Sequence, residues 1–188
     1  MALTYTPPAE NDSLLPEFSG TAVSGKTITA TDFETCKGLL VMFICNHCPY
    51  VKAIENRLID IGRVFKSSDL GVIAVCSNDA ADYEEDSFAN IKARWEELNY
   101  PFEYIYDETQ DIARAFGAVC TPDLFLFQGK GSKKNLYYRG RLDDSWKDPN
   151  TVKTEDLKNA IESLLKDEPA PKEQISSMGC SIKWKSHE

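Results

Sequence analysis

The sequence has no long apolar run, an excess of negative over positive charge and only two histidines. Its longest apolar stretch, residues 39–45, is far shorter than the roughly 20 residues that a membrane-spanning helix needs, so we expect no membrane partner. The 21 lysines and arginines are outnumbered by 30 aspartates and glutamates, which gives a net charge of -9. Because nucleic acids are bound through clustered positive charge, this balance argues against a nucleic-acid partner.

The N-terminal residues also lack the positively charged start and apolar centre of a secretory signal. We therefore expect a cytoplasmic protein. Permanent disulfides are uncommon in that reducing compartment, and cysteines there more often serve catalysis or bind metals. Six cysteines have to be considered: Cys36, Cys45, Cys48, Cys76, Cys120 and Cys180.

Length and composition are those of one folded domain. The chain has 188 residues, of which 42% are hydrophobic and 27% are charged. We expect a single domain over residues 1–188, with a core at about residues 14–166 and a tail at residues 167–188. Two prolines and one glycine in the tail predict irregular structure in that segment. The prolines of the N-terminal extension predict the same for the start of the chain.

Strand and helix patterns alternate along the chain, which predicts an α/β fold with a central mixed sheet flanked by helices. Residues 123–127 and 135–139, joined by a loop at residues 129–132, read as a β-hairpin. The other strands are expected at residues 26–29, 39–44, 71–77 and 102–106, and the helices at residues 49–67, 88–98, 109–116 and 154–165.

A Cys-x-x-Cys motif lies where the most apolar strand meets the longest helix, at Cys45 and Cys48. The amides and macrodipole of a helix N-terminus favour an anion, which lowers the pKa of a thiol placed there. We therefore expect Cys45 to be the nucleophile in thiol–disulfide exchange and Cys48 to resolve the mixed disulfide. His47 between them is expected to tune the thiolate and to favour the oxidising direction. No cofactor is needed for this chemistry.

A second feature is the Thr121-Pro122 pair, which comes just before an apolar strand. A proline at such a turn, if cis, places a loop beside the Cys-x-x-Cys motif.

The sequence resembles the thioredoxin-like superfamily, specifically the peroxiredoxin-like AhpC/TSA-type branch. Four segments carry the resemblance: FICNHCPYV at 43–51, TPD at 121–123, YRGRLDD at 138–144 and MGCSIKW at 178–184. It implies a thioredoxin-like fold with Cys45 and Cys48 as the redox pair. It also implies that Pro122 is cis beside the active site, and that the Thr121 backbone pairs with an extended segment of a bound partner.

The sequence departs from both patterns of the superfamily. Thioredoxins carry a tryptophan before the first cysteine and an acidic residue on the preceding strand, whereas here Ile44 follows a wholly apolar strand. Aligned on Cys48, the proline and threonine of the peroxidase motif are replaced by Val41 and Cys45. Arg139 and Arg141 are the candidates for the arginine that a peroxidase places near its thiolate.

The expected partners are therefore disulfides or dithiols of proteins or small molecules, with peroxide as the alternative of a thiol-dependent peroxidase. Two other classes remain open: a metal-binding module that holds zinc through Cys45 and Cys48, and a non-catalytic interaction domain. Zinc sites usually need four ligands in close pairs, and a second pair is lacking, so we expect no metal. Cys180 and Cys120 are candidates for additional redox thiols. No feature of the sequence determines an oligomeric state.

Overall fold

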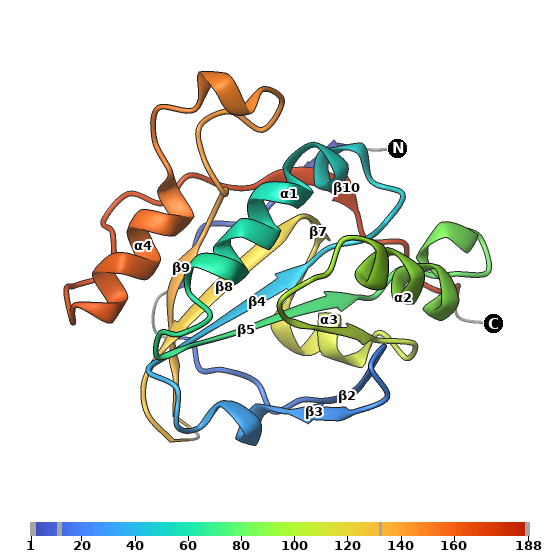
Figure 1. The fold of residues 1–188 in the computed structure, drawn as a ribbon, viewed down its shortest axis with the longest axis horizontal. Helices are drawn as coiled ribbons and strands as arrows, with labels where there is room; N and C mark the ends of the chain where they lie inside the picture. The colour runs from blue at the N-terminus through green and yellow to red at the C-terminus, as the bar shows by residue number, and fades with distance from the viewer. Residues whose placement is uncertain (1–2, 11–12, 132, 187–188) are drawn as a thin grey trace.

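The computed structural model describes residues 3–10, 13–131 and 133–186 (Figure 1). Its larger sheet is mixed, as predicted: β4 (Gly38–Phe43) pairs in parallel with β5 (Leu70–Cys76) and antiparallel with β8 (Asp123–Gln128). The order of its strands is β3 (Thr27–Thr29), β2 (Ser19–Ala22), β6 (Glu103–Tyr106), β5 (Leu70–Cys76), β4 (Gly38–Phe43), β8 (Asp123–Gln128) and β9 (Asn135–Arg139).

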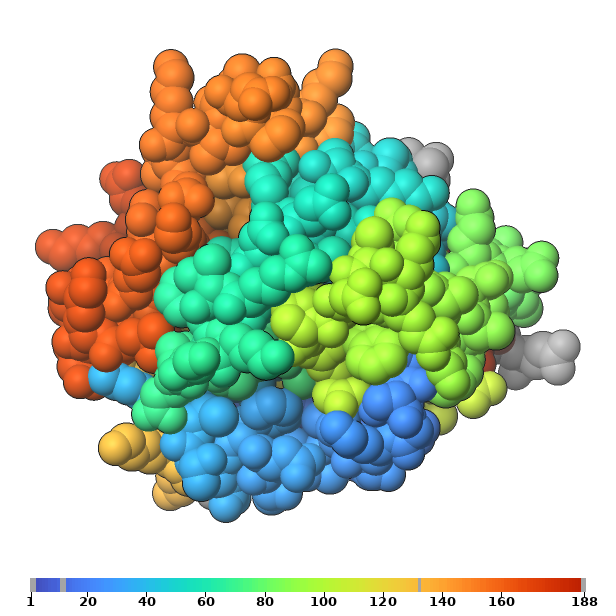
Figure 2. Space-filling model, in the orientation of Figure 1, coloured from blue at the N-terminus to red at the C-terminus, as the bar shows by residue number. Residues whose placement is uncertain are grey.

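The helices cover both faces of this sheet because the buried strands are apolar on both sides. Along β4, Leu40 and Met42 pack into one hydrophobic cluster, whereas Val41 and Phe43 pack into the other. The first cluster holds side chains of α1 (Pro49–Val64), α2 (Phe88–Glu97) and α4 (Asp156–Leu165), and the second holds those of α3 (Asp111–Phe116). Figure 2 shows how closely α1, α2 and α4 cover one face of the sheet.

The predicted elements are present within a few residues of the expected bounds. The expected hairpin is formed by β8 and β9, which pair antiparallel, and residue 132 of its loop lies outside the described residues. Short 3-10 turns lie at η1 (Ala30–Phe33), η2 (Glu84–Asp86) and η3 (Pro149–Thr151). Gly117 ends α3 with φ of 62°, a left-handed conformation that glycine adopts without steric cost. No helix in the described part of the chain is long and apolar enough to cross a membrane.

The prediction of irregular structure at both ends of the chain is wrong in part. A second, three-stranded sheet joins them, in the order β1 (Leu3–Tyr5), β10 (Met178–Ser181) and β7 (Cys120–Thr121). Figure 1 shows β10 lying beside the N-terminal strand, next to the start of α1. These strands are too short to show a period in the sequence, and their pairing is decided by contacts between distant segments.

We predict that the buried β4 residue Leu40 makes a large contribution to stability. Leu40 is fully buried, so Leu40→Ala should lower the free energy of unfolding by about 2–5 kcal/mol through lost contacts and a residual cavity. Val64→Ala is the control, because Val64 is 65% exposed and its loss should change stability by about 0.5 kcal/mol or less. Urea unfolding monitored by circular dichroism measures both. Equal effects of the two substitutions would contradict the assignment of β4 to the core.

Candidate active site

The Cys-x-x-Cys motif occupies the junction between β4 and α1. Cys48 is the residue that caps the N-terminus of α1, and Pro49 is the first residue of the helix, where its missing N–H is not needed. Cys45 lies just beyond the end of β4. Both thiols are buried, with 2% of Cys45 and none of Cys48 exposed. The strand and the helix thus place the two sulfurs at the end of the sheet but beneath the surface.

The Thr121-Pro122 loop lies directly on the two sulfurs. Its peptide bond is cis, as the resemblance implies. The hydroxyl oxygen of Thr121 is 3.2 Å from Sγ of Cys45, and its carbonyl oxygen accepts a hydrogen bond from Sγ of Cys48 at 3.1 Å. One residue therefore contacts both members of the pair, although it is distant from them in the sequence.

The pKa values of the two thiols are shifted in opposite directions: that of Cys45 is raised and that of Cys48 is lowered. The sequence predicted the opposite order. Hydrogen bonding from Cys45, followed by hydrogen bonds from Cys180 and from the backbone amide of Val51, lowers the pKa of Cys48 to about 4 against the cost of burial. Sγ of Cys48 donates to the Thr121 carbonyl oxygen, which favours the protonated form and opposes this lowering.

Burial raises the pKa of Cys45 well above its ordinary value, and the negative charge of Asp86 adds to this effect. These directions, for two thiols that are hydrogen bonded to each other, run opposite to the expectation that Cys45 carries the lower pKa. Cys48, and not Cys45, is the N-cap residue of α1, where the helix dipole favours an anion.

A buried carboxylate holds the loop between the two cysteines. Asp86, at the end of η2, accepts hydrogen bonds from the backbone amides of Asn46 (2.7 Å) and His47 (3.1 Å) and from the side-chain amide of Asn78 (2.8 Å). Burial alone would raise the pKa of Asp86, but these donors and His47 lower it below its ordinary value. Asp86 is therefore an anion, and it fixes the conformation of the residues between Cys45 and Cys48.

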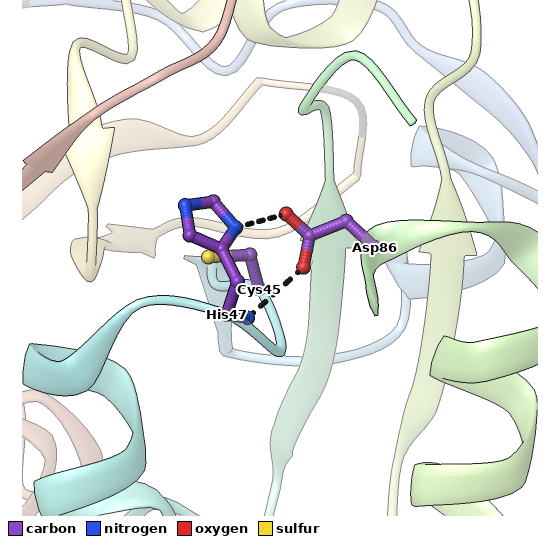
Figure 3. Close-up of side chains that lie close together, drawn as sticks. All are labelled: Cys45, His47 and Asp86. Carbon is purple, nitrogen blue, oxygen red and sulfur yellow. Dashed lines mark hydrogen bonds and ion pairs between the residues drawn. The ribbon is translucent and has the colours of Figure 1, made fainter. Parts of the chain in front are cut away.

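His47 lies close to both this carboxylate and Cys45 (Figure 3). Its Nδ1 donates to Oδ2 of Asp86 at 2.5 Å, and its ring stacks on Tyr83 with centroids 4.5 Å apart. Nε2 is buried and has no hydrogen-bond partner among the described residues. Nδ1 is held by Asp86, and Nε2 is the ring nitrogen that makes no hydrogen bond to Cys45 or to any other described residue.

Sequence reasoning missed Asp86. The residue ends an acidic run at 84–86 that reads as a solvated turn, and about forty positions separate it from the Cys-x-x-Cys motif. Its role depends on η2 folding over the end of the sheet, which no local pattern signals. The acidic group that is lacking on β4 is thus supplied by a different segment.

The other cysteines fall into three environments. Cys180 on β10 is hydrogen bonded to Cys48, so the structure brings this candidate redox thiol into contact with the pair. Cys120 lies nearby on β7, but its thiol donates to the carbonyl oxygen of Pro122 at 3.6 Å. Cys76 is fully buried in β5, and Cys36 is half-buried outside the site. Of the two candidate additional thiols, Cys180 is therefore the one that contacts the pair.

Comparison with known proteins identifies the family. A family model described as AhpC/TSA matches residues 12–134. The chain belongs to the AhpC/TSA family. As a member it is a thiol-based redox protein of the oxidoreductase or peroxidase kind. No curated protein matches the chain.

Several solved structures share the fold of this AhpC/TSA protein. An uncharacterized conserved protein from Geobacillus kaustophilus is 38% identical, with a TM-score of 0.92, and the match covers 100% of this chain and 99% of that one. A hypothetical protein from Sinorhizobium meliloti is 32% identical, with a TM-score of 0.90 and coverage of 98% and 100%. A putative thioredoxin from Neisseria meningitidis is 22% identical, with a TM-score of 0.61 and coverage of 83% and 92%. The fold is thioredoxin-like, as predicted.

The two arginines considered as peroxide ligands in this AhpC/TSA protein pair with carboxylates instead. Arg139 donates to both carboxylate oxygens of Asp123, at 3.1 and 2.8 Å, and Arg141 donates to Asp156 at 2.9 Å. Neither guanidinium is hydrogen bonded to Cys45 or Cys48 among the described residues. The structure therefore brings neither arginine to the thiols.

The residues around Cys45 include possible metal ligands. Cys45, His47 and Asp86 each have a ligand atom within 4.8 Å of the others, whereas Cys48 is not part of this group. Zinc accepts these ligand types but usually takes four in a structural site. Both oxygens of Asp86 and Nδ1 of His47 already take part in hydrogen bonds within the protein. A metal would have to displace those bonds, so the geometry favours orientation of His47 over metal binding.

The lowered pKa of Cys48 should appear as a pH dependence of stability. The surroundings of Cys48 in the folded protein lower the pKa of its thiol from the ordinary value of 9.0 to about 4. Between these values the unfolded state binds more protons, so the contribution of Cys48 to stability is absent below about pH 4 and grows as the pH rises to about 9.

Urea unfolding of the wild type and of Cys48→Ser across this range measures the contribution, and the serine variant should lose the rise. Cys36→Ser is the matched control and should retain it. The same rise in the Cys48→Ser protein would show that another group causes it.

Proposed function

We propose that this AhpC/TSA protein is a thiol–disulfide oxidoreductase in which Cys45 and Cys48 alternate between a dithiol and a disulfide. The observation that carries the proposal is the contact of the two sulfurs with each other and with Thr121 beside the cis proline. The proposed partners are disulfides or dithiols of proteins or small molecules. The proposed site of action is the cytoplasm, where thiols are kept reduced.

The roles of the two cysteines follow from their protonation. Cys48 is the thiolate and attacks a partner disulfide, which forms a mixed disulfide and releases one partner sulfur as a thiolate. Cys45 then attacks Sγ of Cys48, and the second partner sulfur leaves. Because burial keeps Cys45 protonated, this second step needs a base. We assign that role to the imidazole of His47, which has a ring nitrogen within 4.8 Å of Sγ of Cys45, although Nε2 makes no hydrogen bond to that thiol in this structure. The leaving partner thiolate takes that proton up.

Redox titration against glutathione buffers, with alkylation and mass-spectrometric mapping of all six cysteines, tests the proposal. We expect a reversible Cys45–Cys48 disulfide with a defined potential, which is lost in Cys48→Ser and retained in Cys76→Ser. Cys76 is an internal control because it is buried in β5. If Cys45 and Cys48 stay alkylatable under oxidising conditions, the dithiol mechanism is wrong.

The action of His47 on Cys45 has a separate kinetic consequence. In a Cys36→Ser, Cys180→Ser background, an aromatic disulfide reagent should release one thiolate when Cys48 attacks and a second when Cys45 closes the disulfide. His47→Ala removes the base, so the second release should slow by about a hundredfold while the first is little changed. Tyr83→Phe, which keeps the ring stacked on His47, is the control. A second phase that His47→Ala leaves unchanged would refute the role of the imidazole.

A thiol-dependent peroxidase is the second candidate, favoured by the low pKa of Cys48 within an AhpC/TSA protein. In that reaction the Cys48 thiolate takes an oxygen from peroxide and becomes a sulfenic acid, and Cys45 condenses with it to the disulfide with loss of water. Peroxide consumption with excess dithiol, together with a sulfenic acid trap in Cys45→Ser, distinguishes the two. A trapped sulfenic acid and turnover of peroxide would support the peroxidase, and their absence would support disulfide exchange alone.

A further inference from the structure

Strand β10 occupies the place where the resemblance expects a bound partner. The edge of β7 is filled by the chain itself, because Cys180 is paired opposite Thr121 and Ser181 opposite Cys120, both antiparallel. The other edge of β10 pairs with β1, so the C-terminal segment is held from both sides. The expectation that the Thr121 backbone is open to a partner is thus wrong for this conformation, since that edge is already paired.

The pairing brings Cys180 to the sulfur at the centre of the site. Cys48 is hydrogen bonded to the thiols of both Cys45 and Cys180 and also to the backbone amide of Cys180. Burial raises the pKa of Cys180, and its hydrogen bond to Cys48 adds to this effect. The sulfur of Cys48 therefore lies next to two other thiols, those of Cys45 and Cys180.

Close packing fixes β10 on the proline loop. A Cβ on Gly179 would lie 2.0 Å from the carbonyl oxygen of Thr121 and 3.0 Å from Cδ of Pro122, so only glycine allows this approach. The hydroxyl of Ser177 donates to the carbonyl oxygen of Pro122 at 2.9 Å. The chain at Ser177 and Gly179 thus lies directly against the loop beside the thiols.

The segment after β10 is anchored to the network that holds the His47 side chain. The backbone amide of Lys183 donates to Oδ1 of Asn78 at 2.8 Å, and the other end of that side chain donates to Asp86. Gln110 accepts from the amide of Lys185 and donates to the carbonyl oxygen of Lys183. The tail is therefore bound on both sides of Cys180, and its position is coupled to that of Asp86.

We propose that β10 is a built-in exchange partner, in which Cys180 accepts the disulfide of the Cys45–Cys48 pair. The proposal rests on the proposed function, which supplies the oxidised pair. The thiol of Cys180 attacks Sγ of Cys48, the Cys45–Cys48 bond breaks, and a Cys48–Cys180 bond forms. Cys45 leaves as a thiolate and takes up the proton of Cys180, so the step is an isomerisation that needs no further oxidant or reductant.

This exchange gives the oxidised protein two forms with different consequences. In one form the disulfide lies within the motif and Cys180 is a thiol. In the other form the tail is covalently linked to the N-terminus of α1, and Cys45 is a thiol beside His47. A partner that reduces the second form has to reach a disulfide formed with the C-terminal strand.

The test uses the full-length Cys45→Ser protein oxidised with glutathione disulfide and mapped under non-reducing conditions. We expect an intramolecular Cys48–Cys180 disulfide in most molecules. Cys45→Ser with Cys180→Ser should instead accumulate Cys48 joined to glutathione. Cys45→Ser with Cys120→Ser is the matched control and should still form the link, because the thiol of Cys120 bonds to Pro122 and not to Cys48. Cys48 linked to Cys120, or left as the glutathione adduct in Cys45→Ser, would overturn the proposal.

A second variant tests the strand without altering a cysteine. Gly179→Ala should displace β10, because the added Cβ meets backbone atoms that have no room to move. In the reduced protein the alkylation of Cys180 should then accelerate by about tenfold or more, since opening of the segment controls its access. In the oxidised protein the Cys48–Cys180 species should be lost while the Cys45–Cys48 disulfide still forms. Ser181→Ala, on the same strand, should behave as the wild type. If disulfide mapping of the oxidised protein gave the same result for Gly179→Ala and Ser181→Ala, the proposal would be wrong.

The two proposals fail in different ways. If the wild type and Cys180→Ser never form a Cys45–Cys48 disulfide while Cys45→Ser still forms Cys48–Cys180, the proposed dithiol function is wrong, and so is the migration of its disulfide. If the Cys45–Cys48 disulfide forms reversibly and Cys180 stays alkylatable in every oxidised variant, the dithiol function stands and the exchange with β10 is wrong.

Discussion

The site depends on the contact between the Thr121-Pro122 loop and the two sulfurs of the motif. Thr121 touches Cys45 through its hydroxyl and Cys48 through its carbonyl, while its backbone is paired with β10 on the other side. Displacement of this loop would separate the thiols from their acceptor and release the strand that covers them. The small sheet, in which β10 pairs with β1 and β7, therefore covers the site.

Electrostatics inside the site centre on one buried anion. Asp86 is fully buried, and such a charge is tolerated only when donors surround it. Those donors come from the loop between the cysteines and from Asn78. Their hydrogen bonds offset the cost of burying the charge, and they also fix the conformation of that loop. The same anion raises the pKa of Cys45 and orients His47. Burial is the larger cause of the raised pKa of Cys45, and the charge of Asp86 adds to it.

The strand before the motif is apolar throughout, unlike that of a thioredoxin, yet the site is not without an acidic group. Asp86 brings a carboxylate to the motif from η2, and it acts through His47 instead of contacting a thiol directly. The thiolate at Cys48 and the neighbouring Cys180 give the protein a chain of three sulfurs centred on the helix N-terminus.

The sequence by itself determined the elements of the larger sheet except β2, together with the junction at which Cys45 and Cys48 lie. The run at residues 39–44 is apolar enough to define a central strand, and α1 has a clear period. The cis bond at Pro122 was also predicted, through the resemblance.

Only the tertiary structure decided that the pKa of Cys48 is lowered and that of Cys45 raised, that Asp86 reaches His47 and that β10 covers Thr121. The pKa of a thiol depends on every donor and charge around it, and Asp86 and Cys180 come from segments far from the motif in the sequence. A short strand such as β10 has too little pattern to be predicted. Its position is set by the hydrogen bonds and close packing that form when distant parts of the chain meet.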